Sequence, residues 1–180
     1  MLKITVPATE LYDDEKNEYS SSKEQTIQLE HSLISLSKWE SKWKKPFLTQ
    51  ENKSFEESLD YIRCMTITQN VGEEVFRAIT QKQIREINEY IGDPMTATVI
   101  TNHNKRSGPK EIITSELIYY WMIALTIPPE YQKWHLNRLL TLIEVCNIKN
   151  QPPKKMSKRE LMARNRELNS ARRQALNTKG

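Results

Sequence analysis

The sequence predicts a mainly α-helical protein (an α+β fold): a short N-terminal β-hairpin packed on a body of five to six helices, followed by a C-terminal basic helical arm. Three observations predict this fold. Apolar residues alternate with polar ones in the first thirty residues, and they then recur every three or four positions as far as residue 147. Beyond that point, two adjacent prolines precede a segment rich in Lys and Arg.

The hairpin is predicted by two runs with a period of two. Leu2, Ile4 and Val6 alternate with polar neighbours, and residues 26–30 repeat the pattern. The acidic segment 12–18 between them is expected to form the turn. Because an isolated hairpin is only marginally stable in water, it must pack on the helices or pair through its edge with another chain. Self-association through this edge is therefore one expectation.

The first helices are marked by apolar spacing and by capping signals. Leu33, Leu36 and Trp43 lie at helical spacing. Ser54 and Thr80 each stand three residues before Glu or Gln, which is the capping-box pattern that begins a helix. A short helix is expected over residues 72–78.

The most apolar stretch is expected to form the centre of the core. Residues 111–127 carry apolar side chains on nearly every side, which is typical of a buried helix. Pro128 and Pro129 end it, and a second apolar helix is expected over residues 130–147. The short joint predicts that the two helices form a helical hairpin.

The charge distribution divides the chain. Residues 1–148, the predicted hairpin and helical body, carry 17 Lys/Arg against 21 Asp/Glu, a net charge of −4. Residues 149–180 carry 10 against 2, a net charge of +8. Two prolines predict a linker at 149–156. The basic arm, 157–180, begins with a capping box at Ser157 and has only a thin apolar line, so it is expected to become ordered on meeting a partner.

Catalytic chemistry has little support in the sequence. Four glycines and the absence of a glycine-rich phosphate-binding motif argue against nucleotide enzymes. Cys64 and Cys146 fall on apolar helix faces and are expected to be buried thiols. His103 lies on a polar loop without a second ligand nearby. We therefore expect no enzymatic activity, catalytic residue, metal or cofactor, and neither a membrane span nor a signal peptide.

Two groups of residues are candidates for binding. The first comprises the cations of the arm, which suit a phosphate backbone or an acidic protein surface equally well, or are simply solvated: Lys154, Lys155, Lys158, Arg159, Arg164, Arg166, Arg172 and Arg173. The second is an aromatic–basic patch, in which the tryptophans either stack on nucleotide bases or, as we favour, face the core: Trp39, Lys42, Trp43 and Lys45.

A resemblance to a known family rests on strings spread over nearly the whole chain. They are residues 29–33 (LEHSL), 37–43 (SKWESKW), 46–48 (PFL), 60–66 (DYIRCMT), 94–98 (PMTAT), 113–122 (ITSELIYYWM), 134–139 (WHLNRL) and 149–156 (KNQPPKKM). With these strings the chain resembles the tail assembly chaperones of long-tailed, siphovirus-type bacteriophages.

The resemblance implies a non-enzymatic assembly factor. Its partners would be the tape-measure protein, which it keeps soluble, and the tail tube protein, whose polymerisation it assists. It would act in the host cytoplasm during phage assembly and be absent from the mature virion. Many such proteins also have a longer frameshifted form. The alternatives are a structural tail or connector protein of the virion and a nucleic-acid-binding accessory protein that uses the basic arm.

Overall fold

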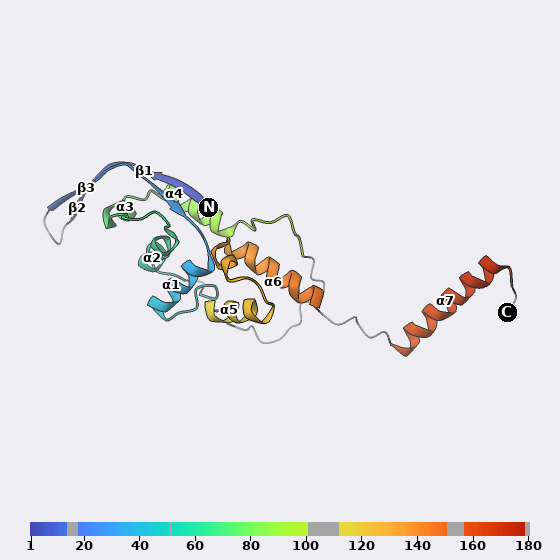
Figure 1. Ribbon diagram of the computed structural model, residues 1–180. Helices are drawn as coiled ribbons and strands as arrows, with labels where there is room; N and C mark the ends of the chain where they lie inside the picture. The colour runs from blue at the N-terminus through green and yellow to red at the C-terminus, as the bar shows by residue number, and fades with distance from the viewer. Residues whose placement is uncertain (14–17, 51, 101–111, 151–156, 179–180) are drawn as a thin grey trace. The chain divides into compact units, whose positions relative to one another are not determined.

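The computed structural model describes residues 1–13, 18–50, 52–100, 112–150 and 157–178 (Figure 1). The chain forms two compact units, Met1–Ile148 and Lys149–Gly180. The first unit is a helical body with an antiparallel N-terminal sheet packed on it, so the predicted fold class is confirmed. In the part of the chain that the structure describes, no helix combines the length and apolarity needed to cross a membrane.

The N-terminal strands form a longer ribbon than the sequence predicts. β1 (Leu2–Val6) pairs with β4 (Gln25–Leu29), and Ile4 lies opposite Ile27 in the core. β2 (Thr9–Asp13) pairs with β3 (Glu18–Ser22) in a second two-stranded sheet. The expected turn at 12–18 is thus wrong in extent, because antiparallel pairing through backbone groups continues into this polar segment. Residues 14–17 lie outside the described residues.

Both edges of the β1–β4 pair contact the body. On the β4 side, the backbone N–H of Ile67 donates to the carbonyl of Gln28 at 2.8 Å. On the β1 side, which runs beside α4 (Figure 1), the side-chain amide of Gln83 donates to the carbonyl of Thr5 at 2.8 Å. The hairpin therefore packs on the helices of its own chain, which was one of the two expectations for it.

The described residues of the body form six α-helices, in agreement with the predicted five to six. Their bounds are α1 (Leu33–Trp43), α2 (Phe55–Met65), α3 (Glu73–Arg77), α4 (Gln81–Gly92), α5 (Ser115–Ala124) and α6 (Leu136–Asn150). The predicted capping boxes at Ser54 and Thr80 are both present, so α2 and α4 begin where the sequence indicates.

The centre of the core is α1 and not the segment 111–127. Leu33, Leu36 and Trp39 of α1 are completely buried, whereas Ile123 of α5 is 77% exposed. α5 begins at Ser115 and packs against α1 with one face only. A helix that is apolar on all sides carries no signal for which side is buried, and the prediction that it is surrounded on every side was wrong.

The predicted helix 130–147 also differs. Pro129–Lys133 forms a 3-10 helix, η1, and α6 begins at Leu136, whose backbone N–H donates to the carbonyl of His31 at 2.7 Å. Because η1 and this tie to the start of α1 separate α5 from α6, the expected two-residue joint of a helical hairpin is absent from this region.

The second unit contains α7 (Lys158–Leu176). The predicted capping box is present between Ser157 and Glu160, and Asn177 ends the helix in a left-handed conformation. Every residue of α7 is exposed. Within the predicted linker, Lys149 and Asn150 belong to α6, and residues 151–156 lie outside the described residues.

Candidate partner-binding groove

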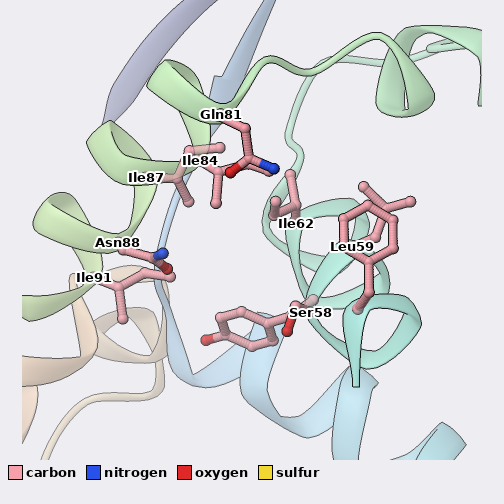
Figure 2. A pocket seen from close by; sticks show the side chains of 10 residues that line it. Ser58, Leu59, Ile62, Gln81, Ile84, Ile87, Asn88 and Ile91 are labelled. Atoms are coloured by element: carbon pink, nitrogen blue, oxygen red, sulfur yellow. The ribbon is translucent and has the colours of Figure 1, made fainter. Parts of the chain in front are cut away.

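An apolar groove lies between α2 and α4 of the body (Figure 2). Its volume is about 230 Å³. Figure 2 shows the isoleucines of α4 on one wall and the apolar side chains of α2 on the other. The lining residues are Phe55, Ser58, Leu59, Tyr61 and Ile62 from α2, and Gln81, Ile84, Ile87, Asn88 and Ile91 from α4.

The groove has a buried floor and an exposed rim. Tyr61, Ile62 and Ile87 are buried, whereas Phe55 at the start of α2 is 67% exposed. The polar rim contains amides and a hydroxyl, with Asn88 as one example, and none of the described residues that line the groove carries a charge. A neutral, apolar surface of this kind binds other apolar groups by removing both from water.

α2 is held in place by hydrogen bonds and ion pairs, which come from α1 and from the segment that follows α1. The indole N–H of Trp39 donates to the backbone carbonyl of Glu57 at 2.8 Å, and Lys45 pairs with the Glu57 carboxylate at 2.6 Å. The hydrogen bond from Lys45 lowers the pKa of Glu57. Asp60 accepts from both Lys42 and Trp43. Burial works to raise the pKa of Asp60, but these hydrogen bonds outweigh it, so the pKa is lowered.

These contacts decide between the two interpretations of the aromatic–basic patch. Trp39 is fully buried and cannot stack on a base, and Trp43 is half-buried with its indole N–H engaged. Lys42 and Lys45 are both occupied by carboxylates of α2. The four residues therefore form a structural anchor for the α2 wall of the groove, and the stacking role of Trp39 is wrong.

α4 is tied to three other parts of the body. Gln83 contacts β1, as described above. The hydroxyl of Tyr90 donates to Glu30 at 2.7 Å, and the amide of Asn137 on α6 donates to the carbonyl of Ile91 at 2.9 Å. Because both walls are fixed to separate neighbours, the space between them does not depend on a direct α2–α4 contact.

Two buried histidines link the walls beneath the floor. His31 is hydrogen-bonded through Nδ1 to the hydroxyl of Tyr61 at 2.6 Å, and its ring lies 5.1 Å from that of His135. His135 Nε2 lies 3.0 Å from the carbonyl of Tyr90, so this nitrogen carries the proton and donates it. The chain of contacts joins Tyr61 of α2 to Tyr90 of α4.

Burial changes the titration of this pair. It lowers the pKa of His31 to about 3, assisted by the nearby His135, and it lowers the pKa of His135 despite the opposing hydrogen bond to Tyr90. Both rings are therefore neutral at pH 7. His31 is 2% exposed, which places it out of reach of a solute. The pair has a structural position, and sequence reasoning missed it because the two histidines are distant along the chain.

The geometry of the groove suits side chains of a partner better than a cofactor. Small-molecule pockets usually enclose about 300–1,000 Å³, so this smaller groove holds one or two side chains. Among the described residues, no group of three or more His, Cys, Asp or Glu is placed to hold a metal ion. The prediction that the two thiols are buried is wrong in degree, because Cys64 and Cys146 are both partly exposed.

The remaining predicted residues lie on the arm. Six of its cations, all exposed, are on α7: Lys158, Arg159, Arg164, Arg166, Arg172 and Arg173. Lys154 and Lys155 lie outside the described residues, as does His103. The structure therefore describes the groove and the cations of α7 as two separate surfaces on two separate units.

Comparison of the chain with models of known protein families, with curated proteins and with solved structures found no match.

Proposed function

We propose that this protein is a non-enzymatic bacteriophage tail assembly chaperone, which binds the tape-measure protein and assists polymerisation of the tail tube. It acts in the host cytoplasm and is released before the virion matures. The sequence strings support the family, and the observation that carries the binding role is the uncharged groove between α2 and α4.

The groove supports a specific mode of binding. An amphipathic helix places apolar side chains at intervals of three and four residues, and such anchors insert into a narrow apolar groove. A groove of about 230 Å³ accepts one or two anchors, so each copy binds weakly. Many copies along one long helical client cover its apolar face, and weak individual binding lets the growing tube displace them.

Co-expression with the tape-measure protein from the same source tests the proposal. The chain should raise the soluble fraction of the client and elute with it. Phe55→Ser, at the rim of the groove, should abolish both effects, whereas Ile123→Ser on α5 should preserve them. Phe55 and Ile123 are 67% and 77% exposed, so the two variants remove similar exposed apolar surface at different places. An insoluble client with the wild-type chain, or equal effects of the two variants, would contradict the proposal.

The alternatives have their own observations and tests. The exposed cations of α7 favour nucleic-acid binding, which predicts salt-dependent binding of duplex DNA that is lost when these cations are neutralised. A structural tail or connector protein would be present in stoichiometric amounts in purified particles, which mass spectrometry measures.

A further inference from the structure

The sequence of α7 repeats every seven residues. Residues 159–165 read RELMARN, 166–172 read RELNSAR, and 173–179 begin with RQAL. Seven residues advance a helix by about 10.5 Å and return it to nearly the same side, with a drift of about 20°. Each repeated residue therefore forms a line along α7.

Two of these lines lie on opposite faces. Leu161, Leu168 and Ala175 form one line, here called the leucine seam. Arg159, Arg166 and Arg173 form the other, here called the outer arginines. A step of two residues turns a helix by about 200°, so the outer arginines are directed about 160° away from the seam. One partner cannot contact both lines at once.

The leucine seam is flanked by positive charge on both sides. On one flank, Lys158 lies three residues before Leu161, and Arg172 lies four residues after Leu168. Arg164, three residues after Leu161, lies on the other. We call these three residues the flanking cations. Leu161 and Leu168 are 48% and 46% exposed, so no residue that the structure describes in their own unit covers the seam.

A seven-residue repeat is the signature of helices that pack side by side over several turns. The phosphates of a nucleic acid impose no such period on a helix. α7 is also 19 residues long with no buried residue, although packing of an apolar face supplies most of the stability of helices in proteins. Both facts indicate that the seam receives another helix.

Charge selects the kind of helix. α7 carries six cations against Glu160 and Glu167, a net charge of +4. Two parallel copies packed through their seams would bring the flank that holds Arg164 against the flank that holds Lys158 and Arg172, and two antiparallel copies would bring like flanks together. Both arrangements place positive charge beside positive charge, and like charges repel. A helix with carboxylates on both sides of its apolar line instead forms charge-assisted pairs with the flanking cations.

We propose that α7 is a docking helix for an acidic amphipathic α-helix of another polypeptide. The partner helix packs its apolar line on the leucine seam, and its carboxylates pair with the flanking cations. The outer arginines stay outside the contact. This inference does not depend on the chaperone function, which rests on the groove of the other unit.

The experiment uses the full-length chain and a labelled synthetic helix of three heptads, with Leu on its apolar line and Glu on both flanks. Fluorescence anisotropy measures its affinity. Two matched variants each remove three positive charges: Lys158→Gln, Arg164→Gln and Arg172→Gln together, or Arg159→Gln, Arg166→Gln and Arg173→Gln together. We expect the first to weaken binding about tenfold and the second less than about twofold. Glutamine is a good helix former, so circular dichroism should show α7 retained in both.

The seam is tested separately. Leu168→Ser should abolish binding of the acidic helix. Leu176 is 72% exposed and lies outside the seam, so Leu176→Ser should leave binding nearly unchanged. The same peptide with Lys on its flanks should not bind.

Four results would overturn the inference. Equal effects of the two triple variants would show attraction to charge without a docking face. Tighter binding of duplex DNA that depends on the outer arginines would assign α7 to nucleic acid. A dimer of the free chain that Leu168→Ser dissociates would assign the seam to a second copy. Full binding by Leu168→Ser would exclude the seam. Phe55→Ser leaves α7 intact, so failure of the groove and failure of the seam are distinguishable.

Discussion

Acidification between pH 7 and pH 5 should destabilise the body through the buried histidine pair. In the folded protein the pKa of His31 is about 3, whereas its ordinary value is 6.5. The unfolded chain therefore binds a proton below pH 6.5 that the folded chain does not bind until about pH 3. Stability is complete above pH 6.5 and falls progressively as the pH decreases towards 3.

The size of the effect follows from the shift. Each pH unit between the two pKa values costs about 1.4 kcal/mol for one group. At pH 5, 1.5 units below 6.5, His31 alone lowers the free energy of unfolding by about 2 kcal/mol. His135 acts in the same direction, since burial lowers its pKa as well. The pKa values of Glu57 and Asp60 are lowered in the folded protein. Their contribution to the free energy of unfolding is therefore lost only as the pH falls below the ordinary pKa of a carboxyl group, outside the range from pH 7 to pH 5.

Urea unfolding followed by far-ultraviolet circular dichroism at pH 7, 6 and 5 measures this dependence. His31→Asn keeps a polar group near Nδ1 for Tyr61 and removes the titrating ring. The variant should be less stable than the wild type at pH 7 but should lose about 2 kcal/mol less between pH 7 and pH 5. A wild-type free energy that is constant over this range, or an unchanged slope in His31→Asn, would refute the reasoning.

Three further perturbations test the anchors. Trp39→Ala removes a fully buried side chain and its bond to Glu57, so it should cost about 3–5 kcal/mol in urea unfolding, and Trp39→Phe clearly less. Asp60→Ala leaves Lys42 and the indole of Trp43 without their acceptor and should cost about 1–3 kcal/mol, while Asp93→Ala, at the exposed end of α4, should change stability by less than about 1 kcal/mol. Ser157→Ala removes the cap of α7 and should weaken this helix by about 1 kcal/mol, which amide exchange of residues 158–176 detects, without changing the unfolding of the body.

The parts of the fold that the sequence predicts well are those with a local signal. In a capping box, a hydroxyl side chain and a carboxamide or carboxylate side chain three residues later each accept a hydrogen bond from the backbone N–H of the other residue. The starts of α2, α4 and α7 therefore follow from the sequence. The apolar face of α2, with Leu59 and Ile62, follows from its helical period. That this face stops short of α4 and leaves a groove does not follow, because it depends on how distant anchors hold each helix.

The errors arise where the signal is uniform or distant. The segment 111–127 is apolar on all sides, so its composition indicates burial but not the face that packs on α1. The amphipathic α1, with polar residues between its apolar ones, is the helix that buries Leu33, Leu36 and Trp39 completely. The contact between His31 and His135 has no local pattern at all, since it arises from the junction of β4 with α1 meeting the start of α6.

The two proposed surfaces differ in the force that drives binding, and this difference separates their roles in solution. The ten lining residues that the structure describes carry no charge, so a client held in the groove gains mainly from apolar burial, which added salt does not screen. The seam of α7 holds its partner with the help of cations that are exposed to solvent, and salt weakens such pairs. A rise from 0.1 M to 0.5 M NaCl should therefore release the acidic helix from α7 and leave a groove-bound client in place. Because the two units are distinct, one chain can exchange its partner on α7 while it retains a client on the body.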